Sequence, residues 1–163
     1  MAKPHINIKK VSASNASPLC GAYGHNLRTN EHEDWSHIDA TKTYLNHDLV
    51  NPAGVFYRDL VDARIREASI EAGRNLMDAD AVIAYTVYLA YTHGAEKANG
   101  FSVSDWEQAS LAWLQGYFGE RNVVSAMVHM DESSPHIHAV VVPITPDGRL
   151  CAKDYTGSRE KMQ

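Results

Sequence analysis

Three histidines in the last third of the chain have the residue type and the spacing of metal ligands. His136 and His138 lie two apart in an apolar stretch, residues 136–144, that predicts a β-strand, so their side chains share one face. His129 lies near the end of the preceding predicted strand, residues 122–130. The short loop between the two strands predicts an antiparallel hairpin with His129 opposite His136. The imidazoles would then converge at a spacing that suits metal–nitrogen bonds of ~2 Å. Because three protein ligands leave coordination positions open, the pattern indicates a catalytic metal site.

The hairpin loop carries two carboxylates beside these histidines. Glu132 could be a further ligand, or it could orient a bound water or an imidazole through a hydrogen bond. Asp131 has the same options, and a solvated loop carboxylate is an equal alternative for it.

The elements around the hairpin predict a sheet between two layers of helices. Residues 5–11 and 81–91 are predicted strands, the second rich in β-branched and aromatic residues. One helix is predicted from apolar residues at helical spacing and a closing glycine: Tyr57, Leu60, Val61, Ile65, Ala68 and Gly73. Both strands of the hairpin are apolar on both faces, as expected for a central sheet covered on each side. We therefore expect a central sheet with helices on both faces.

A second helix is predicted between the strand of residues 81–91 and the hairpin. Ser104 and Glu107 are interpreted as its capping box, and Gly119 as its end. One face of it is expected to pack in the core: Trp106, Ala109, Trp113 and Tyr117.

Size and composition indicate a single domain. The chain has 163 residues, without an apolar run of the ~20 residues that a membrane span needs and without a secretory signal. Cys20 and Cys151 form no CxxC pair, so we expect no disulfide framework and a cytoplasmic location. Residues 153–163 resemble the beginning of another helix, so residues 1–163 are interpreted as the N-terminal domain of a longer protein.

The overall charge argues against a nucleic-acid partner. The net charge is −5 and the pI is about 5.9, whereas domains that bind phosphates are usually basic. A local basic groove could compensate, and a metal ion would add positive charge where a phosphate lies. Four residues could supply such a basic surface: Lys9, Lys10, Lys42 and Arg149.

The ten residues from His129 to His138 (HMDESSPHIH) resemble a family motif. They are similar to the H-x-D-E-x-x-P-H-x-H motif of the MobV (Mob/Pre) relaxases, which belong to the HUH endonuclease superfamily. Upstream, His25-Asn26-Leu27-Arg28 is similar to the H-N-x-R motif of the same family. A weaker match, residues 44–49, resembles an L-N-Y-E-L stretch but holds His47 in place of the tyrosine and Asp48 in place of the glutamate.

The resemblance implies an α/β fold with a central antiparallel sheet and the metal site on its middle strands. It implies a site- and strand-specific endonuclease that nicks single-stranded or hairpin DNA at a plasmid transfer origin and starts mobilization. One divalent ion would bind the scissile phosphate. The family resemblance implies manganese or magnesium, and zinc would also suit imidazole ligands. Coupling or secretion proteins and a dimer of the full-length protein are further expectations of this kind.

The resemblance also assigns roles to individual residues. His25 would be the nucleophile and would keep the 5′-phosphate in a covalent adduct, with Glu132 in the catalytic machinery. Arg28 could make a bidentate phosphate contact. Asn26 and Asn46 could position phosphate or a neighbouring side chain, or only cap turns. Asp48, like Asp131, could support the ligands from outside the coordination sphere.

Other interpretations of these motifs remain possible at this point. Tyr23 or Tyr44 could attack in place of His25. A rolling-circle replication initiator or transposase of the same superfamily would use a tyrosine after the metal motif, where Tyr155 is the only one. An unrelated metal hydrolase, or a metal-binding module without nuclease activity, is the remaining class.

Overall fold

One antiparallel sheet organises the chain. The computed structural model describes residues 6–91 and 100–156. Within these, the sheet has the strand order β1-β3-β5-β4-β2, and every neighbouring pair is antiparallel. The strands are β1 (Ile6–Ser12), β2 (His47–Asp48), β3 (Val82–Ala90), β4 (Val123–His129) and β5 (His136–Val141).

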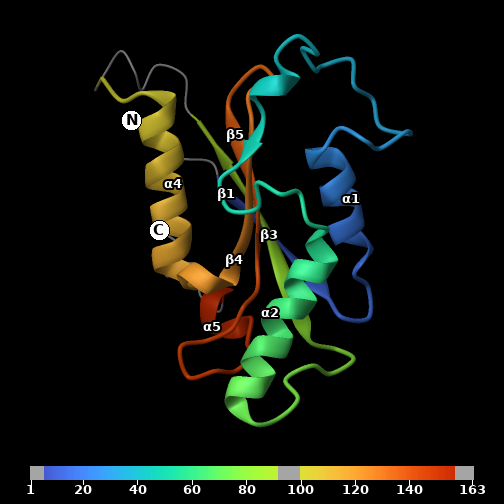
Figure 1. The fold of residues 1–163 in the computed structure, drawn as a ribbon, viewed down its shortest axis with the longest axis vertical. Helices are drawn as coiled ribbons and strands as arrows, with labels where there is room; N and C mark the ends of the chain where they lie inside the picture. The colour runs from blue at the N-terminus through green and yellow to red at the C-terminus, as the bar shows by residue number, and fades with distance from the viewer. Residues whose placement is uncertain (1–5, 92–99, 157–163) are drawn as a thin grey trace.

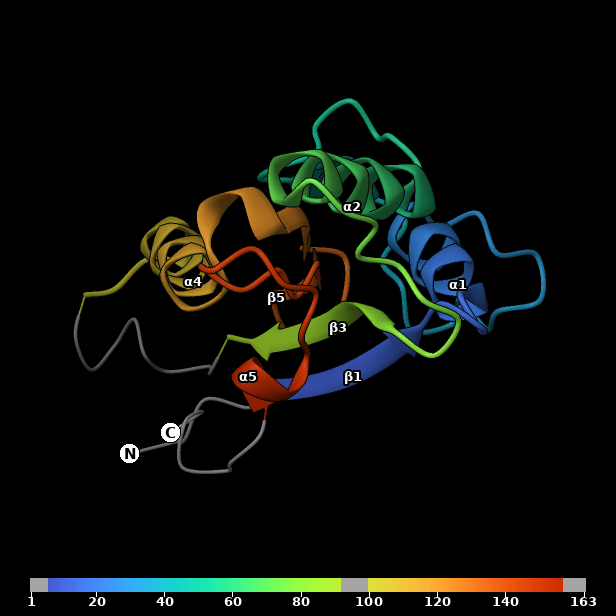
Figure 2. The same ribbon diagram turned by 90° about the horizontal axis from the view of Figure 1, so that it is seen from below.

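Helices cover both faces of this sheet (Figure 1). They are α1 (Ser17–Asn26), α2 (Tyr57–Ala72), α4 (Val103–Phe118) and α5 (Lys153–Thr156), with single turns η1 (Thr43–Leu45) and η2 (Glu120–Asn122). The α1 and α2 helices lie together against one face, as the view from below shows (Figure 2). The α4 and α5 helices pack against the other face. The predicted α/β class with a central antiparallel sheet is confirmed.

Alternation along the central strands divides the core into two layers. On β5, Ile137 and Ala139 pack toward α4, whereas Val140 packs toward α1 and α2. Because side chains alternate along a strand, His136 and His138 face the same side as Val140. The strand register therefore places both histidines under α1.

The α2 helix follows the sequence prediction. Val61, Ile65 and Ala68 are fully buried along one face, and Gly73 ends the helix at φ 65°. This positive φ is the left-handed conformation that glycine adopts without steric cost.

The start and the buried face of α4 differ from the prediction. The capping box consists of Ser102 and Asp105, not Ser104 and Glu107, because the helix begins two residues earlier than expected. Ala109 is exposed. The inward face carries Glu107, Leu114 and Phe118 instead. The expected packing of the aromatic residues is confirmed, since Trp106, Trp113 and Tyr117 are partly buried against the core.

Two sequence expectations lie partly outside the described residues. Residue 5 of the predicted strand 5–11 falls there, as do residues 157–163 of the expected terminal helix. Among the described helices, none is long and apolar enough to span a bilayer.

Candidate metal centre and catalytic site

The β4–β5 hairpin brings three imidazoles together. His129 pairs directly with His136, and His138 pairs with Met127 two residues further along the ladder. The ring centroids of His129, His136 and His138 lie 5.0–5.1 Å from one another. The convergence that the spacing predicts is therefore present.

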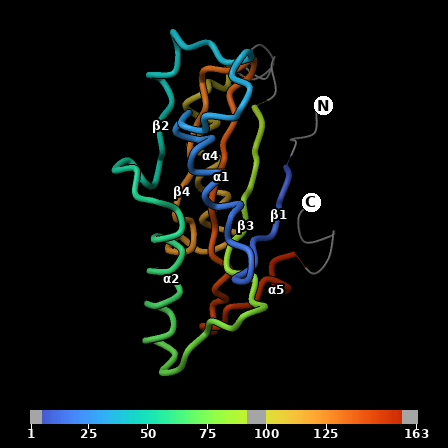
Figure 3. Tube along the Cα trace, turned by 90° about the vertical axis from the view of Figure 1, so that its right-hand side faces the viewer, coloured from blue at the N-terminus to red at the C-terminus, as the bar shows by residue number. Residues whose placement is uncertain are grey.

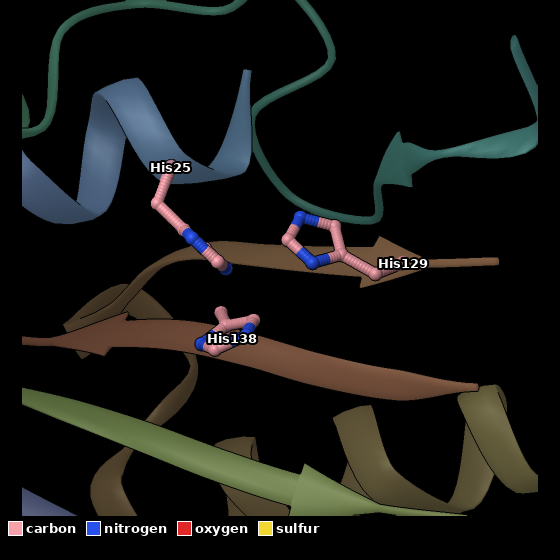
Figure 4. Close-up of side chains that lie close together, drawn as sticks. All are labelled: His25, His129 and His138. Carbon is pink, nitrogen blue, oxygen red and sulfur yellow. The ribbon is translucent and has the colours of Figure 1, made fainter. Parts of the chain in front are cut away.

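A fourth imidazole reaches this cluster from helix α1, which covers this face of the sheet. His25 is the penultimate residue of α1. Its ring centroid lies 5.0 Å from that of His138 and 5.4 Å from that of His129. Figure 4 shows His25 pointing from the helix toward His129 on β4 and His138 on β5. The H-N-x-R segment and the hairpin, a hundred residues apart in sequence, thus form one site.

The ligand atoms of the cluster form two overlapping sets. The candidate atoms of His25, His129 and His138 lie within 4.8 Å of one another, and so do those of His129, Glu132 and His136. The predicted trio is not one compact set, because His136 directs Nδ1 to the Ser134 carbonyl (2.9 Å) and Nε2 toward His129 Nδ1 (3.3 Å). His129 belongs to both sets. Its Nε2 is buried without a hydrogen-bond partner among the described residues, which suits a metal ligand.

Burial keeps two of the imidazoles, those of His129 and His138, neutral. It lowers the pKa of His129, and it lowers the pKa of His138 to about 2, with further lowering by the neighbouring histidines. A neutral imidazole has the free lone pair that a metal ligand needs. The donor set of imidazole nitrogens and a nearby carboxylate therefore fits a divalent cation.

The two loop carboxylates are held by one arginine. Arg28 Nη2 donates to Asp131 Oδ1 (2.6 Å) and to Glu132 Oε1 (2.8 Å), and Arg28 Nε donates to Asp131 Oδ2 (3.1 Å). Asp131 has a side-chain exposure of 0%, so the alternative of a solvated loop carboxylate is wrong. Burial alone would raise the pKa of Asp131, but hydrogen bonds, chiefly from Arg28, lower it to about 2.

Glu132 lies between the arginine and the histidines. Its Oε1 is 3.5 Å from His136 Nε2 and 3.6 Å from His129 Nδ1. Burial alone would raise the pKa of Glu132, yet the nearby rings of His129 and His136 and the hydrogen bond from Arg28 hold it well below its ordinary range. The position is consistent with both expected roles, as a ligand or as a group that orients an imidazole.

The position of Arg28 differs from the expected phosphate contact. Its Nε/Nη2 edge, which would grip a phosphate bidentately, is bonded to Asp131. Only Nη1 faces the nucleophile candidate, 3.5 Å from His25 Nε2. Arg28 thus joins the α1 segment to the hairpin.

The other predicted polar residues have structural contacts. Asn26 is 2% exposed and donates from Nδ2 to the Tyr57 hydroxyl (2.7 Å), so this arrangement leaves it no path to a phosphate. Asn46 Oδ1 accepts from the Met130 backbone N–H (2.7 Å) and steadies the strand end that follows His129. Asp48 accepts from the Ser125 hydroxyl (2.5 Å) and from the backbone N–H of Ala126 (2.9 Å). It anchors edge strand β2 rather than supporting the histidines.

The rival tyrosines are placed very differently. Tyr155 is buried, and its hydroxyl donates to the Ile144 carbonyl (2.6 Å). The Tyr23 hydroxyl donates to the Gly54 carbonyl (2.7 Å). Tyr44 is 81% exposed on η1, next to Thr43, which donates to Asp131 (3.0 Å). Among the three, Tyr44 alone stays accessible near the hairpin loop.

Sequence reasoning missed two residues of the site. Tyr88 pairs with His138 across β3 and β5, and its ring lies 5.2 Å from that of His136 and 5.3 Å from that of His138. Alternation along the predicted strand 81–91 could have located it. Glu33 bonds to Nδ1 of His25. No motif signals that contact, because it depends on the path of the loop after α1.

A groove runs from the histidines toward the edge of the sheet. It has a volume of about 230 Å³ and is lined by Asn7, Lys9, Thr86, Val87, Tyr88 and His138. Asn7 pairs with Tyr88, which pairs with His138, so the three share one face in a row across β1, β3 and β5. Figure 3 shows β1 at the outer edge of this sheet.

The fold of this chain matches that of a solved protein domain. The structure superposes on crystal structures of the MobM relaxase domain (MOBV; Mob_Pre), described as Mn-bound and bound to plasmid pMV158 oriT DNA. One matches with a TM-score of 0.79 at 24% identity, covering 99% of this chain and 80% of that chain. Another, at pH 6.8, matches with a TM-score of 0.75 at 25% identity, with the same coverage.

The chain belongs to the plasmid recombination enzyme (Mob_Pre) family, whose model matches residues 3–163. It is 29% identical over 157 residues to plasmid recombination enzyme type 1 of Staphylococcus aureus, covering 96% of this chain and 38% of that protein. It is 31% identical over 158 residues to a plasmid recombination enzyme of Bacillus thuringiensis, covering 95% of this chain and 34% of that protein. The chain thus spans little more than a third of the length of these relatives.

Proposed function

We propose that this chain is the nicking domain of a plasmid mobilization relaxase, a metal-dependent endonuclease and transesterase that acts on one DNA strand. The observation that carries the proposal is the position of His25 on helix α1. Its ring centroid lies 5.0 Å from that of His138 and 5.4 Å from that of His129 on the sheet below. A nucleophile beside a candidate metal centre is the arrangement that phosphoryl transfer requires. Membership of the Mob_Pre family supports the same assignment.

The metal would be held by His129, His136 and His138, with His136 Nε2 exchanging its contact with His129 Nδ1 for the cation. A bound divalent cation would neutralise charge on the non-bridging oxygens of the scissile phosphate. Manganese is favoured because the MobM structures are described as Mn-bound, and magnesium and zinc are the alternatives. Glu132, within 3.6 Å of His129 and His136, would fix the orientation of both rings.

His25 would attack phosphorus through Nε2. A nitrogen–phosphorus bond forms while the bond from phosphorus to the 3′-oxygen breaks, and that oxygen takes a proton from water. The 5′-phosphate stays on His25 as a phosphoramidate. Attack by a 3′-hydroxyl reverses the step, releases His25 and rejoins the strand. Arg28, with Nη1 3.5 Å from Nε2, would hold the ring toward the hairpin.

The groove beside His138 would take the DNA strand next to the scissile phosphate. Lys9 supplies a positive charge there, and Asn7 and Thr86 supply hydrogen-bonding groups. Two other expected basic residues have acidic partners, since Lys42 pairs with Asp39 (3.0 Å) and Arg149 with Asp147 (2.6 Å). A short local contact of this kind is compatible with a net charge of −5. Single-stranded or hairpin DNA of a transfer origin is the proposed substrate. Contacts with coupling proteins and dimer formation would be properties of the longer protein of which this chain is proposed to be the N-terminal domain.

A labelled oligonucleotide from the cognate transfer origin tests this function. With Mn²⁺, wild type should nick it and form a denaturant-resistant, acid-labile adduct that His25→Ala does not form. Tyr44→Phe is the matched control and should keep the adduct. An acid-stable adduct that persists in His25→Ala and disappears in Tyr44→Phe would move the attack to Tyr44. No nicking of the verified origin by metal-loaded wild type would exclude the relaxase function.

A further inference from the structure

The proposed attack requires one particular tautomer of His25. A neutral imidazole carries its proton on one nitrogen and its lone pair on the other, and only the lone pair can attack phosphorus. The preferred tautomer depends on the hydrogen bond made by the nitrogen that does not attack.

Glu33 contacts that other nitrogen. Its Oε1 bonds to Nδ1 of His25, and its Oε2 accepts from Asn30 Nδ2 at 2.9 Å. An ionised carboxylate only accepts hydrogen bonds, so Nδ1 must be the donor and must carry the proton. Arg28 Nη1, which can only donate, lies 3.5 Å from Nε2, a contact that agrees with this tautomer but is too long to fix it without Glu33.

The loop after α1 is built to present this carboxylate. Arg28 adopts a positive φ of 57° and turns the chain back, and Thr29 N–H donates to the Gly24 carbonyl (2.8 Å). Asn30 then lies against α1, where a Cβ at Gly24 would be only 1.9 Å from Asn30 Oδ1. The glycine that precedes His25 therefore allows Asn30, and with it Glu33, to approach the ring.

Trp35 closes the same loop over the histidine. Its Nε1 donates to the Asn30 carbonyl (3.1 Å), and its ring lies 5.9 Å from the His25 ring. The Arg28 guanidinium lies 5.3 Å from the Trp35 ring, in the range of a cation–π contact. Glu33 thus sits in an ordered structure with several contacts, rather than meeting His25 as an isolated surface pair.

We infer that Glu33 is a positioning residue for His25, which holds the proton on Nδ1 and directs the Nε2 lone pair toward the phosphate. The inference rests on the proposed function, in which His25 is the nucleophile. When Nε2 bonds to phosphorus the ring becomes positively charged, and the carboxylate of Glu33 balances this charge while Nδ1 keeps its proton. When the strand is rejoined, the ring returns to the same neutral tautomer.

Glu33→Ala tests the inference against Glu31→Ala, which removes an exposed carboxylate of the same loop. The tautomer of His25 is measured by long-range ¹H–¹⁵N NMR at alkaline pH, in the metal-free chain and with Mg²⁺. Wild type and Glu31→Ala should carry the proton on Nδ1, and Glu33→Ala should shift toward Nε2. Single-turnover nicking on the cognate oligonucleotide should fall about 10- to 100-fold in Glu33→Ala, with DNA affinity unchanged.

The two readouts separate failure of this inference from failure of the proposed function. An unchanged tautomer in Glu33→Ala, or a nicking rate equal to that of Glu31→Ala, would overturn the role of Glu33 while wild-type nicking stands. Absence of nicking in wild type would overturn the proposed function, and the tautomer measurement would still decide whether Glu33 sets the proton on His25. Should Glu33→Ala not fold, Asn30→Ala removes the partner that anchors the carboxylate and should produce the same shift to a smaller extent.

Discussion

Arg28 and Asp131, 103 residues apart in the sequence, form a buried ion pair with 2.6 Å between Nη2 and Oδ1. The pair joins the segment that follows His25 to the loop that follows His129. The distance between the proposed nucleophile and the proposed metal ligands therefore depends on it. Its loss should affect both stability and catalysis.

Arg28→Met should destabilise the protein by about 3–5 kcal/mol, because it leaves the carboxylate of Asp131 buried without a counter-charge. Urea unfolding of the metal-free chain measures this. Arg58→Met, which breaks a half-exposed pair with Asp62, is the control and should cost at most about 1 kcal/mol. Equal losses in the two variants would mean that the Arg28–Asp131 pair does not carry the expected energy.

The same pair makes stability depend on pH in the acid range. The pKa of Asp131 is lowered from 3.8 to about 2 in the folded chain. A lowered folded-state pKa stabilises fully above the unfolded value, so this contribution is complete above about pH 4 and is lost as the pH falls through 2. It amounts to about 2 kcal/mol.

Comparison with Asp131→Asn isolates this contribution. Titration of the histidines is common to wild type and variant and cancels in the difference. Urea unfolding at several pH values should show that the stability advantage of wild type over Asp131→Asn shrinks between about pH 4 and pH 2. A difference that stays constant over this range would show that Asp131 does not titrate in the way its contacts imply.

The hairpin shows what the sequence could predict. A strand period of two places His136 and His138 on one face, and a short loop places His129 opposite His136, so local rules suffice. The family motif then adds His25. Its contact with His138 could not follow from local rules, since the two residues meet only when α1 packs on the sheet.

The contacts of the long loop show what the sequence could not predict. Glu33 reaches His25 because Arg28 takes a positive φ, a conformation that nothing in the local residue pattern signals. Asp131 lies in a polar loop sequence that suggests exposure, yet its side chain is buried against Arg28, 103 residues away in the sequence. For Ser102 and Asp105, a shift of two residues in the helix start moved the capping box, which is the usual uncertainty of element ends.

Removal of one imidazole should weaken metal binding without unfolding the chain. His138→Ala should reduce Mn²⁺ affinity at least tenfold in calorimetric titration, because it removes a proposed ligand whose burial keeps it neutral. His47→Ala, which removes an exposed histidine on β2, should leave the affinity unchanged. In wild type, Mn²⁺ at 100 times its Kd should raise stability by about 2.7 kcal/mol. Unchanged affinity in His138→Ala would exclude this residue as a ligand.

Lys9 should contact the DNA strand, although the net charge of the chain is negative. Its side chain lines the groove beside His138, whereas Arg149 is bonded to Asp147 (2.6 Å) and Asp154 (2.8 Å). Lys9→Ala should therefore weaken binding of the cognate single strand and lower the slope of log affinity against log salt by about 0.7, the value for one phosphate contact. Arg149→Ala removes the same charge and should leave that slope unchanged, since its guanidinium is already neutralised.

Fluorescence anisotropy at several salt concentrations measures both variants. Equal slopes for Lys9→Ala and wild type would place the strand outside the groove and require another path to His25.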